Sequence, residues 1–170
     1  YGLDVQATDD IFLHGKSFST VEGHSSEFDA GDELHIISED VAWISTTHNN
    51  FTSSGTLYMT SSSSSVASHS YCRFEANRIE GDVYETAFLW LGASELTVNT
   101  NGYIRAYLQG SLTLISCHLH DDIYLLIDDQ AYLDMQHTVV DYYASLTDQA
   151  EGYMENCTFT RSGDIGLYVH

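Results

Sequence analysis

The chain has 170 residues, of which 43% are hydrophobic, a length that suits one domain with a substantial core. Its 25 Asp and Glu residues against 5 Lys and Arg give a formal net charge of -20 at pH 7, which disfavours binding to nucleic acid or to anionic membranes. No apolar run is long enough to span a membrane, so membrane insertion is not expected. The excess of acidic over basic residues leaves two interpretations open. The protein works in strong salt or in a solution rich in cations such as calcium, or it is an ordinary acidic secreted protein.

The first part of the chain, residues 1–41, contains only scattered strand-like pieces. The segments DIFLH (10–14) and ELHIIS (33–38) are separated by a polar stretch that contains glycines. We therefore expect an irregular N-terminal part or cap, followed by one regular unit over residues 42–170. The serine run 61–65 interrupts the pattern of that unit and is interpreted as a loop or as a Ser-rich outward strand.

A repeat of about twenty residues is clearest in the second half of the chain. The segments SLTLISCHLH (111–120), AYLDMQHTVV (131–140) and GYMENCTFT (152–160) align with one another, and another strand-like segment follows each of them. Each repeat, or rung, thus contains two strands and two bends. Recurrence of the same residue types at this interval favours stacked rungs over an antiparallel sandwich or jelly roll. The sequence predicts an all-β protein that folds as a single-stranded parallel β-helix, a solenoid.

Two columns of the aligned repeats are expected to face the interior, because strand side chains two positions apart share a face. The first column contains Phe51, Phe74, Leu119, Val139 and Phe159. The second, called the cysteine column, contains Asn49, Cys72, Cys117, His137 and Cys157. The polar residues between them, expected in solvent, are Asn50, Arg73, His118, Thr138 and Thr158. Cysteines two rungs apart would be separated by about 9.6 Å, beyond the bridging limit of about 7 Å, so all three should be free.

The C-terminal sequence NCTFTRSGDIGLYV, with Gly163 and Gly166, resembles the right-handed parallel β-helix superfamily that includes pectate lyases, polygalacturonases and phage tailspikes. The resemblance covers residues 42–170 and is one of repeat style. It implies a right-handed solenoid and, as one function, cleavage of acidic or bacterial-surface polysaccharides. The sequence has no Gly-His-Gly or Arg-Ile-Lys segment of the polygalacturonase kind and no proline-containing arginine motif of the pectate-lyase kind. The enzyme interpretation is therefore secondary.

A polysaccharide hydrolase would need two carboxyl groups that flank the scissile bond. Asp121 and Asp141, which lie one rung apart by sequence, are the candidate catalytic pair. The competing explanation is a solvated acidic face, because some carboxylates will align in any chain this acidic.

No cofactor is expected, and calcium is the alternative, because hard cations prefer carboxylate oxygens. The candidate calcium ligands are the aspartates of two expected bends, Asp121 with Asp122 and Asp128 with Asp129.

A transition-metal site is a second metal hypothesis. His118, His120 and Asp122 alternate along one strand, which can present ligands to zinc or copper. A bend expected near Asp121 argues against Asp122 continuing that strand. The cysteine column could also be interpreted as a soft-metal site, although internal packing of small and medium side chains explains it better.

Tyr103, Tyr124 and Tyr143 recur at intervals of 21 and 19 residues and are the candidate glycan-binding ladder. Cross-rung packing of the rings is the alternative explanation for this ladder. Two sequons place Asn50 and Asn156 as glycosylation acceptors, each expected to point outward and to be used if the protein is extracellular.

From these observations we expect a structural or adhesive module of an extracellular fibre, virion spike or surface appendage. It would form a homo-oligomer or filament through subunit contacts that include the solenoid ends, because unpaired strand edges are used or covered in natural proteins. The C-terminal GLYVH suggests a strand in mid-stack. The alternative is a protein that binds or cleaves surface polysaccharide. Both place the chain outside the cell or on a virion surface.

Overall fold

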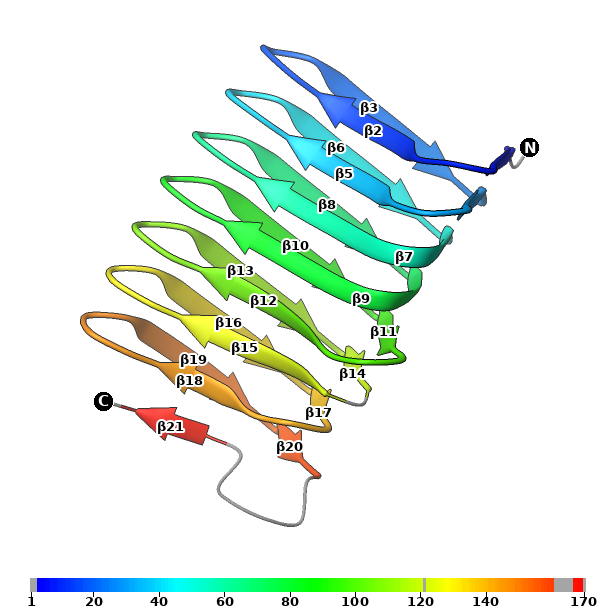
Figure 1. Cartoon of the computed structure of the whole chain (residues 1–170). Helices are drawn as coiled ribbons and strands as arrows, with labels where there is room; N and C mark the ends of the chain where they lie inside the picture. Colours follow the sequence, from blue (N-terminus) through cyan, green and yellow to red (C-terminus); the bar gives the residue numbers. More distant parts are fainter. Residues whose placement is uncertain (1–2, 121, 161–166, 170) are drawn as a thin grey trace.

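The computed structural model describes residues 3–120, 122–160 and 167–169, the last range by its backbone alone. Every strand pair in this part of the chain is parallel. The strands form a seven-stranded and a fourteen-stranded sheet, which together make a solenoid of about seven turns (Figure 1). This confirms the predicted all-β parallel solenoid. The described residues include no helix that is long and apolar enough to cross a membrane.

The seven-stranded sheet receives one strand from each rung. Its members are β3 (Thr20–His24), β6 (Trp43–Thr47), β8 (Val66–Ser70), β10 (Phe88–Gly92), β13 (Ser111–Ile115), β16 (Tyr132–Gln136) and β19 (Glu151–Glu155).

The fourteen-stranded sheet is bent into two wings, and the long strands β7 (Asn50–Ser61) and β9 (Arg73–Val83) run through both. Wing A also contains β1 (Asp4–Ala7), β4 (Glu27–Ala30), β11 (Glu95–Val98), β14 (His118–Leu119), β17 (Val139–Val140) and β20 (Thr158–Phe159). Wing B also contains β2 (Ile11–Gly15), β5 (Leu34–Ser38), β12 (Gly102–Ala106), β15 (Ile123–Ile127), β18 (Ala144–Leu146) and β21 (Leu167–Val169). In Figure 1, wing B faces the viewer and the seven-stranded sheet lies behind it.

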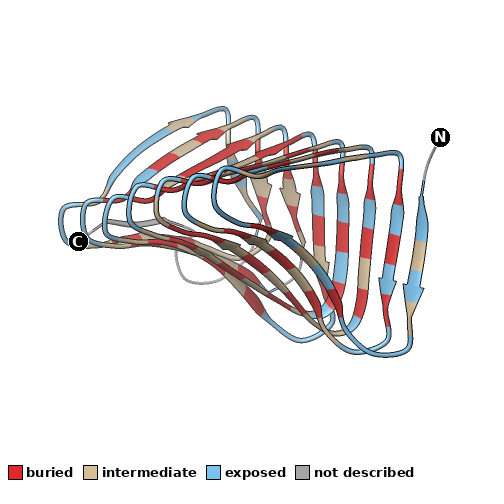
Figure 2. Ribbon diagram, turned by 90° about the horizontal axis from the view of Figure 1, so that it is seen from above, coloured by how far each residue is buried: buried red, intermediate tan, exposed pale blue. Residues whose placement is uncertain are grey.

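The core fills the space that these three faces enclose. Buried and exposed residues alternate along the strands (Figure 2), as the period of two requires. In β15, for example, Ile123, Leu125 and Ile127 are buried. Phe51 stacks on Phe28 and on Phe74, with ring centroids 5.1 Å apart in both pairs. The same inward column continues through Leu96, Leu119 and Val140.

A sharp corner joins the seven-stranded sheet to wing A in each rung. Its first residue has positive φ and is never glycine among the described residues: Ser25, His48, Tyr71, Ala93, Ser116, His137 and Asn156. The next residue carries a small polar or thiol side chain in most rungs, and several of these side chains accept a hydrogen bond from the rung before. The Ser26 amide donates to Asn49 Oδ1 at 2.7 Å, and the Cys72 amide donates to Ser94 Oγ at 3.1 Å. Buried backbone donors at the corners are satisfied in this way.

The cysteine column needs one correction. The position below Cys117 is Thr138, whose Oγ1 accepts a hydrogen bond from the Cys117 amide at 3.3 Å, whereas His137 is the exposed corner residue with φ of 51°. Leu119 accordingly stacks on Val140, not on Val139. The prediction assumed a constant rung length, but equivalent positions are 23 residues apart at Ser26 and Asn49 and 19 apart at Asp141 and Thr160. All three cysteines are free, as expected.

The N-terminal residues differ from the irregular part expected over 1–41. Strands β1 to β5 lie in this range and pair in the same sheets as the later rungs. The repeat is weak in this part of the sequence because several inward positions are small, such as Gly15 and Ala30, and because hydrophobic Phe12 points outward with 59% exposure.

Candidate functional site

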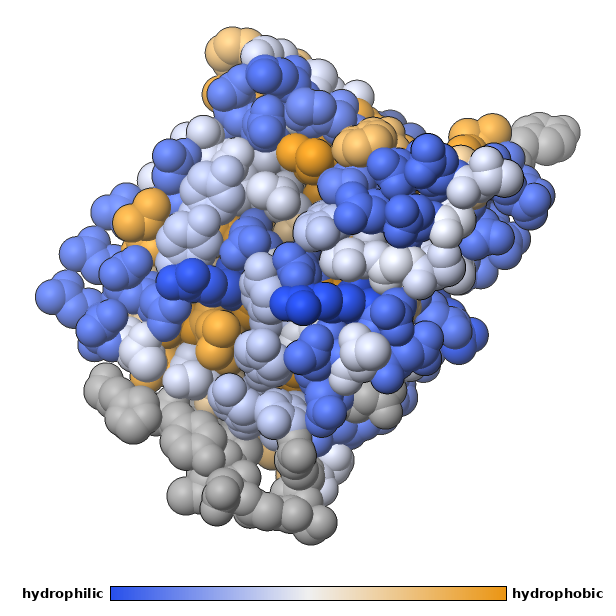
Figure 3. All heavy atoms as spheres, in the orientation of Figure 1, coloured by the Kyte–Doolittle hydropathy of each residue, from blue (hydrophilic) through white to orange (hydrophobic). Residues whose placement is uncertain are grey.

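An aromatic ladder follows the outer face of wing B. It occupies one outward column whose members are in register on successive rungs: Phe12, His35, Tyr58, Glu80, Tyr103, Tyr124 and Tyr143. The predicted tyrosine ladder is thus present, and it extends toward the N-terminus beyond the three predicted members. Figure 3 shows this face, on which pale and orange side chains are interspersed with hydrophilic ones.

The ring geometry of the aromatic ladder varies along its length. Tyr124 and Tyr143 are stacked, with centroids 5.7 Å apart, whereas Tyr103 is tilted against Tyr124 at 6.2 Å. His35 stacks on Phe12 at 4.4 Å and on Tyr58 at 4.6 Å. Packing between rungs therefore accounts for part of this arrangement, and it covers both faces of the His35 ring.

Carboxylates interrupt the aromatic ladder near its middle. The Tyr103 hydroxyl donates to Glu80 at 3.4 Å and to Asp82 at 3.5 Å. Burial raises the pKa of Tyr103 to about 12, and the negative charges of Asp82 and Glu80 act in the same direction. Burial also raises the pKa of Asp82, although Arg105 opposes the shift. This part of wing B therefore offers hydrogen-bond acceptors between aromatic faces.

The outer face of the seven-stranded sheet is different, and we call its central part the neutral face. It consists of the outward residues of β6, β8, β10 and β13: Trp43, Ser45, Thr47, Val66, Ser68, Ser70, Phe88, Trp90, Gly92, Ser111, Thr113 and Ile115. None of these residues is charged. Acids return only on the flanking strands, for example Glu22 on β3 and Asp134 on β16.

Trp90 flattens the neutral face. A Cβ added to Gly92 would meet the Trp90 ring at 2.2 Å, so the indole lies directly against this glycine. Thr113, which is in register with Trp90, is only 6% exposed. A shallow hollow lined by Tyr71, Trp90 and Ile115, among others, lies at the edge of the face next to the corner.

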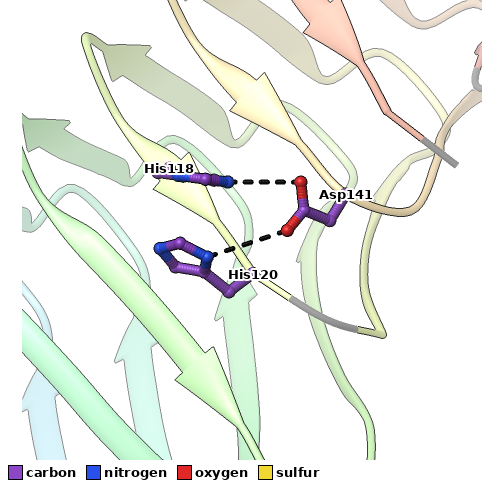
Figure 4. Close-up of side chains that lie close together, drawn as sticks. All are labelled: His118, His120 and Asp141. Carbon is purple, nitrogen blue, oxygen red and sulfur yellow. Dashed lines mark hydrogen bonds and ion pairs between the residues drawn. The ribbon is translucent and has the colours of Figure 1, made fainter.

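Wing A brings two histidines and an aspartate together (Figure 4). His118 Nε2 lies 3.2 Å from Asp141 Oδ1, and His120 Nδ1 lies 3.7 Å from Asp141 Oδ2. Thr160 donates a hydrogen bond to Asp141 Oδ1 at 2.7 Å. Burial would raise the pKa of Asp141, but the hydrogen bonds from Thr160 and His118 and the charges of the two histidines outweigh it and lower that pKa.

This cluster changes two interpretations from the sequence. The third residue beside the histidines is Asp141 from the next rung, in place of Asp122. The sequence could not show this, because Asp141 belongs to the following rung and comes next to His120 only through the pairing of β14 with β17. For the candidate catalytic pair, Asp121 lies outside the described residues, so the structure gives Asp141 only its contacts with His118, His120 and Thr160.

Of the aspartates expected to bind calcium, Asp121 lies outside the described residues and the other three have interaction partners. Arg105 Nε donates to Asp128 Oδ2 at 2.9 Å, Thr147 donates to Asp128 Oδ1, and the Leu108 amide donates to Asp129 Oδ2 at 3.3 Å. Asp122 is exposed and also has an interaction partner. Calcium binding at these bends stays a prediction.

Both sequon asparagines are exposed, Asn50 at the start of β7 and Asn156 at a corner. Exposure is what a glycosylation acceptor requires, and use of the sequons stays a prediction. In comparisons with protein-family models, with curated proteins and with solved structures, nothing matched this chain.

Proposed function

We propose that the protein is a structural module of an extracellular fibre, virion spike or surface appendage, and that it associates side by side with a second copy through the neutral face. The observation that supports this most is the absence of charge from that face in a chain whose net charge is -20. Membership of the right-handed β-helix superfamily, which the repeat style suggests, is part of the same proposal.

Electrostatics favours the neutral face over wing B for self-association. Two copies that met through wing B would bring Glu80 and Asp82 toward like charges, and desolvating carboxylates is costly. On the neutral face the buried groups would be hydroxyls and aromatic rings, among them Trp43 with 54% exposure. Cores of protein interfaces are likewise depleted in charge and enriched in aromatic residues.

Sedimentation equilibrium at low and at high salt tests this proposal. Salt screens the repulsion between two chains of charge -20, so we expect monomers at low salt and dimers or larger assemblies at high salt. Negative-stain electron microscopy at high salt would show whether assembly continues to filaments. Monomers under all conditions would refute self-association.

Ser68→Asp is the informative variant, because Ser68 lies in the middle of the neutral face on β8. The added charges should face each other across the contact and return the protein to monomers at high salt. Ser145→Asp is the matched control: it changes the same residue type in an outward position that is also half-buried, but on β18 of wing B. Equal effects of the two variants would place the contact elsewhere.

Glycan binding along the aromatic ladder is a second proposal, supported by rings in register over successive rungs and by acceptor carboxylates among them. Aromatic faces stack on pyranose rings, and carboxylates accept hydrogen bonds from sugar hydroxyls. Affinity electrophoresis in gels that contain neutral or acidic polysaccharides would detect binding. Tyr124→Ala should abolish retardation, whereas Tyr132→Ala, on the seven-stranded sheet, should leave it unchanged. Release of reducing ends would favour the cleaving alternative.

A further inference from the structure

Two imidazoles and one carboxylate converge on the outer face of wing A. His118 belongs to β14, His120 follows it two positions later on the same face, and Asp141 comes directly after β17 of the next rung. Their ligand atoms all lie within 4.8 Å of one another. Figure 4 shows the carboxylate facing both histidine rings. The convergence results from solenoid stacking, since β14 and β17 pair in parallel and the residues directly after them are His120 and Asp141.

The spacing of these atoms matches the coordination shell of a small transition-metal ion. Zinc bonds of about 2.0–2.1 Å in tetrahedral geometry place neighbouring ligand atoms about 3.3 Å apart. The corresponding distances are 3.2 Å from His118 Nε2 to Asp141 Oδ1 and 3.7 Å from His120 Nδ1 to Asp141 Oδ2. The two imidazole rings lie against each other with centroids 3.5 Å apart, so they have to rotate for both nitrogens to bind one ion together with Asp141.

The surroundings support a metal ligand role for Asp141. Thr160 donates to its Oδ1 at 2.7 Å and so fixes the orientation of the carboxylate, as second-shell partners do in metal sites. Glu95 is in register with His118 and adds negative charge next to the cluster. The side chains of His118 and His120 keep 37% and 31% exposure, so an ion can enter from solvent.

We infer that His118, His120 and Asp141 bind one divalent transition-metal ion, with Zn²⁺ as the best match to this ligand set. The ion ties β14 to β17, which are only two residues long each, and leaves one coordination position open to water. Nitrogen ligands select against Ca²⁺ and Mg²⁺, which take oxygen ligands. The site is separate from the neutral face and from the aromatic ladder.

Isothermal titration of the untagged full chain with ZnCl₂ tests the inference. We expect saturable binding of one ion per chain and a higher Tm with Zn²⁺, and no comparable binding of Ca²⁺ or Mg²⁺ at this site. Asp141→Asn should weaken Zn²⁺ binding by more than about tenfold, because loss of even a second-shell partner costs about 10- to 100-fold. Asp122→Asn, at the position that the sequence favoured, should keep wild-type affinity.

His14→Asn is a further control. His14 lies 3.2 Å from Glu39 and so forms a histidine–carboxylate pair without a second histidine. Its replacement should leave Zn²⁺ affinity unchanged, whereas His120→Ala should lower it by more than about tenfold. Retention of wild-type affinity by Asp141→Asn would overturn the inference, whatever the other variants do.

A measurement on the wild-type protein protects the test against variants that misfold. In ¹⁵N-labelled protein, the imidazole nitrogen signals of His118 and His120 should move on addition of one equivalent of Zn²⁺. The remaining histidines should not respond. Shifts at other histidines, or none at all, would refute the site without any substitution.

Discussion

The two broad faces of the solenoid share one interior and differ on the outside. Behind the neutral face the inward positions of β10 hold Leu89 and Leu91, and behind the aromatic ladder β12 holds Ile104, all of them buried. Outward, the seven-stranded sheet keeps its central rungs free of charge, whereas wing B mixes tyrosines with Glu80 and Asp82. The inward positions therefore specify the fold, and the outward positions are free to give each face its own chemistry.

The comparison predicts, first, that inward substitutions cost far more stability than outward ones. Phe51→Ala removes the middle ring of the stacked phenylalanines, and Phe51 is fully buried. We expect a loss of about 3–5 kcal/mol in the free energy of unfolding, measured by urea denaturation. Tyr124→Ala, outward on wing B, removes three ring contacts worth about 0.2–1 kcal/mol each and should cost less. Similar losses for the two variants would show that the outer ladder also carries the fold.

The second prediction concerns His69, a titratable residue buried behind the neutral face. His69 is fully buried on β8, its Nδ1 lies 2.6 Å from Thr46 Oγ1, and burial lowers its pKa to about 4 from 6.5. Because the unfolded chain binds the proton first, stability is fully present above pH 6.5 and is lost as the pH falls toward 4. A shift of this size corresponds to about 3 kcal/mol.

Urea denaturation between pH 7 and pH 4 would measure this loss. In His69→Leu the slope between pH 6.5 and 5 should be much smaller, because the aspartates and glutamates titrate mainly below that range. An unchanged slope would assign the pH dependence to groups on the outer faces instead.

The third and smallest prediction alters only the neutral face. Gly92→Ala places a Cβ at 2.2 Å from the Trp90 ring, so the indole has to leave its flat position. We expect a loss of about 1–3 kcal/mol, a change in tryptophan fluorescence and weaker self-association at high salt. In a Trp90→Ser background the same glycine change should have almost no effect, because the clash is gone. If it still destabilised the protein, Trp90 would not be the cause.

The interior was the part of the fold that the sequence predicted best. The Phe51 and Phe74 positions and the buried cysteines were placed correctly, because only inward positions must stay apolar or small on every rung. The error at His137 arose at a corner. The corner residues have positive φ, a conformation that glycine usually indicates in a sequence, but none of the described corner residues is a glycine. The sequence therefore does not show where each corner lies, or that a rung has become shorter.

The candidate sites were predictable only where they follow the rung interval. Tyr103, Tyr124 and Tyr143 do so and were found. The position of Asp141 next to both histidines follows from the pairing between rungs, which the sequence does not show. The alternation of residues along one strand indicated Asp122 instead. The neutral face consists of outward residues from four strands that lie side by side. It can be recognised only when the register between these strands is known.

The length of the rungs varies along the solenoid without breaking it. Paired residues are 23 apart at Thr20 and Trp43, 19 apart at Tyr132 and Glu151, and again 23 apart at Ala144 and Leu167. The parallel pairing continues across these steps, so the bends between strands absorb the difference in length. The bends are therefore the places where insertions and deletions of a few residues would cost the fold least.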